Sequence, residues 1–595
     1  MFYNTCFGGW GLMKQINICL CVALVFLLGF LSLIVKLHEL QVADASKYGY
    51  ANARQSIRRV QTESERGRIL DRHGRILAES RPTLSIVCQP SFFQCRTWDE
   101  TVQKITQAIE DVSRVIGRPS AISEAMIRRH VNQSLAISLT VWREITEEEV
   151  FAFSAHADEC PGFEIVETSE RVYPYGSLAS HVIGYVGRDR GESQAGDESF
   201  SYFDPEMRGR TGLEIYYDSF LRGVPGERKI LVDARGFAIR EWTALESRPG
   251  LDLELSLDSD IQRVVEQELA GEKGACAVLN PQTGEVLALA SAPSFDLNDF
   301  VPFLRHEVYR RYAHDPDKPL LNRASGGLYA PGSTFKPVTA LAGLMFGISA
   351  DTTYDCDGVY RLGSLSLRCA SIWGHGPLDM REAMMRSCNP YFCNLAMEVG
   401  TNALFVAARA LGLGLRTGLD LGVDEPSVLP DADWKMKKYH QSWYPGDLAQ
   451  MGIGQGMLLV SPLQMACIAG AIGTGKLVRP HLKRDLSSEP QPLPFTREQL
   501  AVVREGMAWV VNGHDGVRGG GWRAAEDLPV TVCGKTGTAE IGQGVTRRKN
   551  AWFIAYAPAE NPSIALAIIV ENGEAGGTTT APKVNVILKE IFGVK

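Results

Sequence analysis

The residues best suited to nucleophilic catalysis are Ser333 and Lys336, which form an S-x-x-K motif. The run that follows is compatible with a helix, and Pro337 is tolerable there only in the first turn. Ser333 would then lie at a helix N-terminus, and Lys336 would return to the same face and reach its hydroxyl. A serine becomes a good nucleophile when a base takes its proton. A lysine can be that base once burial or nearby positive charge lowers its pKa.

A second motif, Ser387-Cys388-Asn389, offers a hydroxyl and an amide two residues apart. Both side chains can face one cleft, where Ser387 would relay protons and Asn389 would orient substrate carbonyl groups. A serine in such a position could equally cap a helix. The motif by itself is therefore weakly specific.

A third motif, Lys535-Thr536-Gly537-Thr538, comes directly after an expected strand. At a strand edge, Lys535 and Thr536 can hold a substrate carboxylate, and Gly537 leaves room for the substrate backbone to add as a further strand. Alone, this motif could be a surface turn. The three motifs in this order, each on the expected type of element, together predict acyl transfer through the serine of the first motif.

A fourth group, made of Cys356, Cys369, His375 and Cys388, has the spacing C-x12-C-x5-H-x12-C. Three thiolates and one imidazole form a closed tetrahedral set suited to a structural Zn²⁺. Because Cys388 is the middle residue of the second motif, a bound metal would fix the catalytic loop. The alternatives are a disulfide between Cys356 and Cys369, buried free thiols, or Asp357 as a substitute ligand.

Composition limits the other functions that the chain could have. Its 595 residues predict two or three folded units, and a formal net charge of −8 argues against a nucleic-acid partner. The sequence contains no P-loop, dinucleotide fingerprint or fixed-period repeat, so nothing points to a nucleotide cofactor. Of the thirteen cysteines, those outside the candidate metal set, including Cys393, favour buried thiols over a disulfide framework.

The elements expected to position the motifs predict an α+β fold. Strands are expected at both ends of a domain spanning 253–595, with helical segments between them, which favours one antiparallel sheet covered by helices. The expected strands are two within 274–291, then 528–534, 551–557 and 563–571. A mixed domain at 36–252 should contain a helix at 101–115, because its apolar residues recur at helical spacing.

Over nearly its whole length the chain resembles the class B penicillin-binding proteins. Three segments resemble motifs of the family's non-catalytic pedestal, or dimerisation-type, domain, where they should form salt-bridged junctions and tight turns: 66–74, 171–187 and 209–223. Three others resemble the elongation branch, penicillin-binding protein 2: 291–296, 322–324 and 452–456. That branch has a metal site built from carboxylates, a His and a Cys. Here Cys356 and Cys369 would replace the carboxylates.

This resemblance implies a peptidoglycan D,D-transpeptidase. Lys336 would deprotonate Ser333, which would attack the penultimate D-Ala carbonyl of a stem peptide ending in D-Ala-D-Ala. Backbone N–H groups of Ser333 and Thr538 would hold the oxyanion, and Ser387 would pass a proton to the leaving D-Ala. Lys535 and Thr536 would recognise the terminal carboxylate. A β-lactam would acylate the same serine, and an amine of a neighbouring stem would resolve the natural acyl-enzyme.

An uncharged run at 16–35 is long enough to cross a bilayer core of roughly 30 Å as a helix. We therefore expect a cytoplasmic tail at 1–15 and a single-pass anchor in the bacterial inner membrane. Four basic residues follow the run: Lys47, Arg54, Arg58 and Arg59. The charge rule alone would put the large part inside. We place the catalytic domain on the extracytoplasmic side, because peptidoglycan exists only there.

The resemblance also implies partners: a SEDS-family glycosyltransferase and scaffold proteins of the elongation complex. A division-type class B enzyme is the nearest alternative to this function. A D,D-carboxypeptidase or β-lactamase would need a group that activates water, and none is identified. A β-lactam sensor would need a cytoplasmic signalling domain, whereas fifteen residues precede the apolar run. A non-catalytic scaffold is disfavoured because all three motifs are intact.

Overall fold

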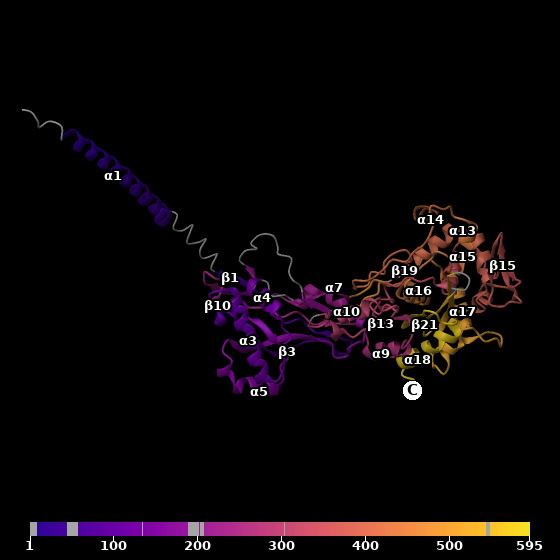
Figure 1. The fold of residues 1–595 in the computed structure, drawn as a ribbon. Helices are drawn as coiled ribbons and strands as arrows, with labels where there is room; N and C mark the ends of the chain where they lie inside the picture. The colour runs from indigo at the N-terminus through magenta and orange to yellow at the C-terminus, as the bar shows by residue number, and fades with distance from the viewer. Residues whose placement is uncertain are drawn as a thin grey trace, which may run out of the picture.

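The computed structural model describes residues 9–43, 57–133, 135–188, 201–202, 207–302, 304–542 and 548–594. Its first helix, α1 (Gly9–His38), contains the apolar run expected to cross a membrane. Within the span Leu20–Ala43, an 18-residue window has a mean hydropathy of 2.7, and none of that window is buried against other parts of the protein. The helix therefore fits a single-pass membrane anchor, and Figure 1 draws it in indigo at the pedestal end of the molecule.

The pedestal combines helices with two main sheets. One sheet has the order β10-β9-β1-β7, and the other joins β11, β2, β3 and β4, with β5 also pairing with β3. The strands are β1 (Ile57–Thr62), β2 (Ile69–Leu70), β3 (Ile76–Cys88), β4 (Leu139–Trp142), β5 (Phe163–Val172), β6 (Val186–Arg188), β7 (Ser201–Tyr202), β8 (Met207–Gly209), β9 (Gly226–Val232), β10 (Ala238–Leu245) and β11 (Leu253–Glu254). The helices are α3 (Trp98–Ile116), α4 (Glu124–Gln133), α5 (Glu147–Ala155), α6 (Ser180–Ile183), α7 (Gly212–Tyr216) and α8 (Asp218–Arg222).

The helix predicted at 101–115 is confirmed as α3. It begins three residues earlier than expected, because Thr97 and Glu100 form a reciprocal capping box at its start. It ends at Gly117, whose φ of 72° is left-handed. Its apolar stripe, which includes Ile105 and Ile109, is buried.

The three pedestal motifs meet at the buried carboxylate of Glu214. Arg66 Nε donates a hydrogen bond to Glu214 Oε2 at 2.6 Å, and Arg171 Nε donates one to Oε1 at 2.7 Å. Arg66 also pairs with Asp218 at 2.8 Å. The predicted salt-bridged junction is confirmed, and it joins segments about 150 residues apart, since Arg66 and Glu214 are separated by 148 positions. A buried carboxylate is tolerable here because both of its oxygens are paired.

The catalytic domain is built on a five-stranded sheet of order β13-β12-β22-β21-β20. Its strands are β12 (Gly274–Leu279), β13 (Val286–Ala292), β20 (Cys533–Ile541), β21 (Arg548–Ala557) and β22 (Ile564–Val570). Every neighbouring pair is antiparallel, so the predicted single antiparallel sheet, made from the two ends of the domain, is confirmed. Every residue of β12 and β22 is buried, which requires cover on both faces.

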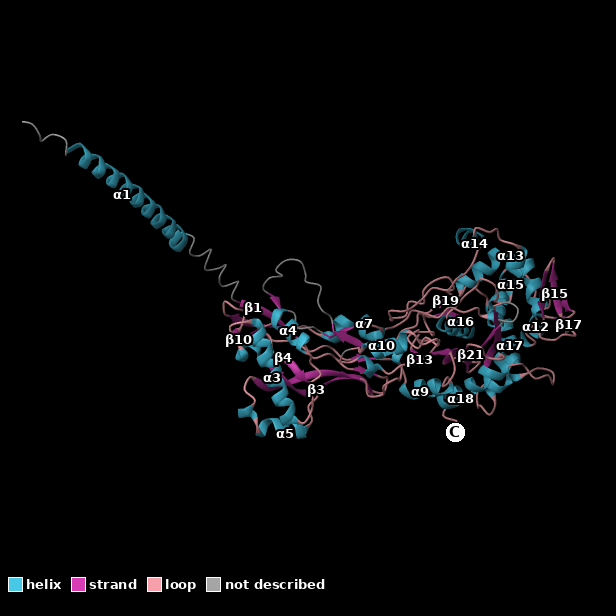
Figure 2. Cartoon of the chain, in the orientation of Figure 1, coloured by secondary structure: helices cyan, strands magenta, loops and turns pink. Residues whose placement is uncertain are grey.

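Helices supply that cover, as Figure 2 shows. α16 packs against β12, β21 and β22, while α9 packs against β13 and α17 against β20. The helices of this domain are α9 (Ser259–Glu268), α10 (His306–Ala313), α11 (Lys336–Met345), α12 (Met380–Met385), α13 (Asn389–Ala410), α14 (Ala432–Tyr439), α15 (Pro445–Gly452), α16 (Pro462–Thr474), α17 (Arg497–Asn512) and α18 (Ala581–Ile591). Short strands complete it: β14 (Tyr354–Cys356), β15 (Val359–Leu362), β16 (Leu365–Arg368), β17 (Gly376–Leu378), β18 (Lys476–Leu477) and β19 (Gln491–Pro492). The α+β class is as predicted.

The last catalytic motif lies within a strand instead of following one. β20 begins at Cys533 and runs through Lys535 and Thr538 to Ile541, whereas the sequence predicted a strand at 528–534. Burial along the motif alternates, with Lys535 and Gly537 inward and Thr536 and Thr538 partly exposed. This alternation could not be recognised in the sequence, because all four residues of the motif are polar or small. β20 is an edge strand of the described sheet.

Candidate active site

Ser333 lies on a short 3-10 turn, Gly332–Phe335, immediately before α11. The helix was expected to open at Ser333 but begins at Lys336, with Pro337 as its second residue. Gly332 has a φ of +56° and its N–H donates to the carbonyl of Gly454 at 2.8 Å. A Cβ on Gly332 would lie 2.7 Å from the carbonyl oxygen of Thr538, so the turn abuts β20 closely. Ser333 itself is half-buried.

Lys336 is fully buried and points its ammonium group at the loop of the second motif. Its Nζ donates to the backbone oxygen of Ser387 at 2.7 Å, to Oγ of the same residue at 3.3 Å and to Oδ1 of Asn389 at 2.7 Å. Burial lowers the pKa of Lys336 to about 8. The spacing predicted a contact with the Ser333 hydroxyl, but no hydrogen bond joins these two side chains in the described chain. All three ammonium protons are directed at the 387–389 loop instead.

Ser387 connects the second motif with the third. Its Oγ also accepts a hydrogen bond from Lys535 Nζ at 3.0 Å, and Lys535 donates to the carbonyl of Thr536 at 2.9 Å. Burial, and then the positive charge of Lys336, hold the pKa of Lys535 well below its usual value. Ser387 adopts a left-handed φ of 53°, an unusual conformation for a residue with a side chain. Such backbone strain is common at functional sites.

The structure thus brings Lys336, Ser387, Asn389 and Lys535 into one hydrogen-bonded group beside the turn that carries Ser333. Asn389 is held by a second bond, since its Nδ2 donates to the carbonyl of Arg368 at 2.7 Å. These contacts connect segments up to about 200 residues apart in the chain. The grouping that the motif order predicted is therefore present in the structure.

A glycine is required at position 537 because of close packing that could not be predicted from the sequence. A Cβ at this position would lie 2.8 Å from Cγ2 of Thr334 and 3.1 Å from the carbonyl oxygen of Pro331. It would also lie 3.0 Å from Cβ of Trp552. From the sequence, we expected the missing side chain of Gly537 to make room for a substrate. In the structure, it lets β20 pack directly against the catalytic turn.

The four predicted metal ligands also converge. The ligand atoms of Cys356, Cys369, His375 and Cys388 all lie within 4.8 Å of one another. Nδ1 of His375 is 3.6 Å from the sulfurs of Cys356 and of Cys369, and the sulfurs of Cys369 and Cys388 are 4.0 Å apart. Tetrahedral Zn²⁺ with ordinary bond lengths requires about 3.6 Å between S and N ligands and about 3.8 Å between two S ligands. The donor set therefore fits zinc.

The other candidate residues of this region lie outside that group. Cys356 and Cys369 are free thiols, so the structure contains no disulfide between them. Cys393 is fully buried and its thiol points to the carbonyl of Ala449 at 3.5 Å. Asp357 is paired with Arg361 at 2.6 Å at the surface. Neither Asp357 nor Cys393 belongs to the cluster in the structure.

Two residues of the site were missed as such from the sequence. The ring of Phe392 lies 5.5 Å from Lys336 Nζ, within the range of a cation–π contact. Nε2 of Gln455 donates to the carbonyl of Thr538 at 3.3 Å and so fixes the end of the third motif. Gln455 was noticed only as part of the 452–456 segment, and Phe392 carried no signal beyond its place on the helix after Asn389.

Family comparisons agree on the nature of both domains. Residues 274–592 match the model of the penicillin binding protein transpeptidase domain, and residues 61–255 match that of the penicillin-binding protein dimerisation domain. The two matches together cover the pedestal and the catalytic domain, and the first alone covers more than half of the chain.

Relatives and solved structures match nearly the full length. The chain is 31% identical to the peptidoglycan D,D-transpeptidase MrdA of Escherichia coli K12, over 96% of this chain and 93% of that protein. It is similar to the Helicobacter pylori penicillin-binding protein PBP2 in its complex with MreC, with a TM-score of 0.78 and 27% identity over 90% of this chain and 99% of that one. A chain in a peptidoglycan synthase complex that coordinates polymerization and crosslinking gives a TM-score of 0.71 and 29% identity, over 97% and 98%.

Proposed function

The chain belongs to the penicillin-binding proteins, as a class B member of the elongation (PBP2) type, and from this premise we propose that it crosslinks peptidoglycan stem peptides during cell-wall elongation through an acyl-enzyme at Ser333. The observation that carries the assignment of residues is the convergence of two buried lysines, Lys336 and Lys535, on Ser387 beside the serine turn. A division-type role for the same chemistry is the alternative, and the similarity to MrdA and PBP2 favours elongation.

Lys336 serves as the base in the acylation step. Its lowered pKa gives a neutral fraction near neutral pH, which a fully exposed lysine would lack. The neutral amine takes the proton of Ser333 Oγ as that oxygen attacks the penultimate D-Ala carbonyl of the donor stem. The site must shift slightly for this, because the amine points to the 387–389 loop when no substrate is bound.

Ser387 carries the proton onward. Its hydroxyl is hydrogen-bonded to both Lys336 and Lys535, so it can receive a proton from one ammonium while donating its own to the nitrogen of the departing D-Ala. The C–N bond of the donor breaks as this nitrogen is protonated. An amine of a neighbouring stem then attacks the acyl-Ser333 ester, its proton returns through the same groups, and the crosslink forms.

The third motif binds the donor. Because β20 is an edge strand, its outer N–H and C=O groups are available to pair with an extended peptide. Lys535 and Thr536 hold the terminal carboxylate of D-Ala-D-Ala or of a β-lactam. Backbone N–H groups of Ser333 and Thr538 hold the developing oxyanion.

Cys356, Cys369, His375 and Cys388 hold a structural zinc ion. The interatomic spacing described above supports this assignment. Because four protein ligands would leave no open position, a bound zinc ion would supply rigidity and no Lewis-acid chemistry. By binding Cys388, it would fix the segment that carries Ser387 and Asn389.

α1 anchors the protein in the bacterial inner membrane with the catalytic domain on the extracytoplasmic side, where peptidoglycan lies. The solved relatives in complex with MreC and in a peptidoglycan synthase complex support partners from an elongation complex. A SEDS-family glycosyltransferase is the polymerising partner that we propose.

The assignment of Ser333 is tested with the full-length protein in detergent. Incubation with penicillin should add one β-lactam mass, carried by the peptide that contains Ser333. With a glycan polymer bearing pentapeptide stems, the protein should release D-Ala and form dimeric muropeptides. Ser333→Ala should lose both activities while keeping its melting temperature. A penicillin adduct on another residue, or dimers formed by Ser333→Ala, would refute the assignment.

A further inference from the structure

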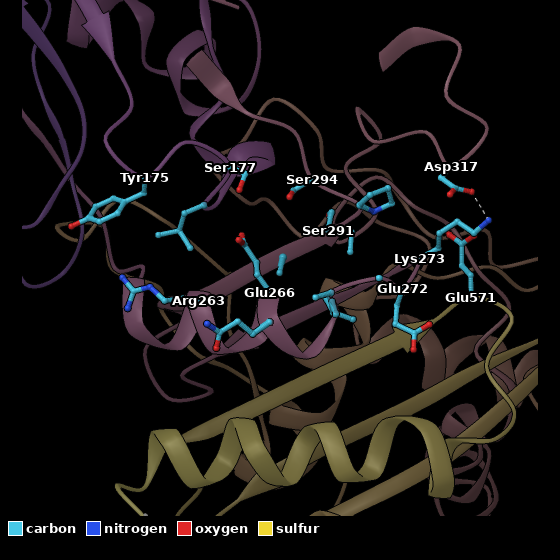
Figure 3. Close-up of a pocket in the computed structure, with 18 of the residues that line it drawn as sticks. Tyr175, Ser177, Arg263, Glu266, Glu272, Lys273, Ser291, Ser294, Asp317 and Glu571 are labelled. Carbon is cyan, nitrogen blue, oxygen red and sulfur yellow. Dashed lines mark hydrogen bonds and ion pairs between the residues drawn. The ribbon is translucent and has the colours of Figure 1, made fainter. Parts of the chain in front are cut away.

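The two edge strands of the catalytic sheet have different surroundings. At the β13 edge, Ser291 lines a cavity of about 810 Å³, which Tyr175 and Ser177 of the pedestal also line (Figure 3). At the opposite edge, β20 lies beside the turn that carries Ser333, and in the described sheet it has no further strand on that side. The distance between β20 and the turn must therefore be set by other contacts.

This distance matters because the proposed oxyanion hole is divided between the two elements. One donor is the backbone N–H of Ser333, on the turn, and the other is that of Thr538, on the strand. Each must lie about 2.7–3.1 Å from the position that the oxyanion will occupy. An inference about their separation rests on the proposed function, in which both N–H groups contact the reacting carbonyl.

Packing limits how closely the two elements can approach. A Cβ on Gly537 would lie 2.8 Å from Cγ2 of Thr334 and 3.1 Å from the carbonyl oxygen of Pro331. A Cβ on Gly332 would lie 2.7 Å from the carbonyl oxygen of Thr538. Such contacts resist compression, but each pair of atoms in contact attracts only weakly. A directed attraction is needed to keep the strand from moving away from the turn.

The segment 452–455 supplies that attraction, because it is hydrogen-bonded to both elements. The N–H of Gly332, the residue before the nucleophile, donates to the carbonyl of Gly454 at 2.8 Å. Nε2 of Gln455 donates to the carbonyl of Thr538 at 3.3 Å. Two adjacent residues thus hold the two parts of the chain that contribute the oxyanion donors.

The segment is itself held in place, as a positioning element must be. Oγ1 of Thr339, on α11, donates to the carbonyl of Gly452 at 2.8 Å, which joins the segment to the helix after the catalytic turn. The N–H of Gln455 donates to the carbonyl of Gln450 at 2.9 Å, which joins it to the last turn of α15. A displacement of Gln455 would therefore disturb two helices.

We propose that Gln455 is a positioning residue for acyl transfer. By holding Thr538 while Gly454 holds Gly332, it sets the separation of the two oxyanion donors. Among the described residues, its side chain is hydrogen-bonded to Thr538 alone. Loss of its amide should widen the hole without removing either donor. The expected cost is about tenfold in the acylation step, which is less than the 10²–10³-fold that loss of a donor costs.

The test follows the ester carbonyl of the acyl-enzyme, whose infrared stretching frequency falls when oxyanion donors bond to it. The full-length protein in detergent is acylated by penicillin with and without ¹³C at the β-lactam carbonyl, and the difference spectrum isolates this band. Gln455→Met is similar in length but lacks the donor, so its band should move towards that of the unfolded adduct. The acylation rate constant at saturation should fall about tenfold, with an unchanged dissociation constant for the noncovalent complex.

Gln450→Met is the matched control, because Gln450 is also half-buried and its side chain makes no hydrogen bond to a described residue. It should keep the band, the rate constant and the dissociation constant of the unaltered protein. Thr339→Val removes the bond to Gly452 from another element and should move the band in the same direction as Gln455→Met. Melting temperatures show that each variant is folded.

An unchanged band in Gln455→Met would overturn the proposal, whether or not its melting temperature falls, because a purely structural role moves stability alone. A weaker noncovalent complex with an unchanged band would make Gln455 a binding residue and would also contradict it. If penicillin adds no mass at Ser333 in the unaltered protein, the proposed function fails and the role of Gln455 fails with it. An adduct at Ser333 with equal bands in Gln455→Met and Gln450→Met refutes the role of Gln455 alone.

Discussion

The ammonium groups of Lys336 and Lys535 converge on one hydroxyl, that of Ser387, at 3.3 Å and 3.0 Å. Both lysines are fully buried, and neither has a carboxylate partner in the described chain. Two like charges near one polar atom in a dry site disfavour the doubly charged state. The arrangement thus favours loss of a proton from one lysine, which is what a base for Ser333 requires.

This relationship predicts how acylation depends on pH. In the proposed mechanism the neutral form of Lys336 is the base, so the acylation rate by penicillin should rise with pH and level off above its pKa of about 8. Below that pKa, the rate should fall about tenfold per pH unit, as the neutral fraction does. A stopped-flow measurement with a fluorescent penicillin gives the profile. A flat profile across this range would contradict the assignment of Lys336 as the base.

Lys336→Arg separates charge from basicity. Arginine retains the positive charge but stays protonated at any accessible pH. Acylation should therefore fall by about 10²–10⁴-fold, the usual contribution of a general base. Lys437→Arg, at an exposed position of α14, is the matched control and should acylate normally. If Lys336→Arg acylates as fast as this control, the base lies elsewhere.

The closeness of β20 to the catalytic turn gives a second prediction. In Gly537→Ala, the new Cβ meets Thr334 and Pro331 at 2.8 Å and 3.1 Å, so the turn bearing Ser333 must move. Overpacking of this kind costs about 1–3 kcal/mol, and acylation should slow by at least roughly tenfold. Gly520→Ala is a suitable control, because its Cβ would lie 3.7 Å from the nearest atom, Oγ1 of Thr536. Equal acylation rates for the two variants would show that the turn tolerates the displacement.

Much of the site could be predicted because its polar residues lie in short motifs that occur in a recognisable order along the chain. The order of the three motifs that contain Ser333, Ser387 and Lys535 predicted the cluster, and the spacing of the Cys and His residues predicted the four grouped candidate ligands. The partners of Lys336 could not be predicted, since they depend on the left-handed backbone at Ser387. The full length of β20 could not be predicted either, because a lysine occupies one of the buried positions in its alternation of buried and exposed residues.

The pedestal shows a further limit of prediction from sequence. The apolar periodicity of α3 predicted its helix to within a few residues, because that signal is local. The convergence of Arg66 and Arg171 on Glu214 was foreseen only through resemblance to a family.

Glu214→Gln should destabilise the pedestal strongly. It leaves the buried guanidinium group of Arg171 without a charged partner among the described residues and Arg66 paired with Asp218 alone, and breaking a buried pair costs about 3–5 kcal/mol. Thermal unfolding should show a lower midpoint, while penicillin should still acylate Ser333 at temperatures where the protein is folded. Asp99→Asn removes an exposed partner of Arg128 and should change the midpoint little. A midpoint for Glu214→Gln equal to that of this control would mean that the network contributes nothing.

The proposed zinc site predicts a coupled loss of metal, stability and acylation. Cys393→Ala is the control for this experiment. Cys393 is fully buried but lies outside the cluster, so its truncation leaves a small void and lowers the melting temperature somewhat. Its zinc content and acylation rate should stay those of the unaltered protein. The control thus separates the general cost of altering a buried cysteine from the effect of losing the metal.

Cys388→Ser removes one of the four ligands and should weaken zinc binding by more than the roughly 10–100-fold that loss of an outer-shell partner costs. Because metal binding is also folding free energy for this segment, the melting temperature should fall. Ser387 and Asn389 flank the lost ligand and hold Lys336, so acylation should slow although Ser333 and Lys336 are unchanged. Elemental analysis of protein never exposed to chelator should give one zinc per chain for Cys393→Ala and little for Cys388→Ser. Less than about a tenth of an equivalent in the unaltered protein would rule out a structural zinc site, since four such ligands should retain the metal.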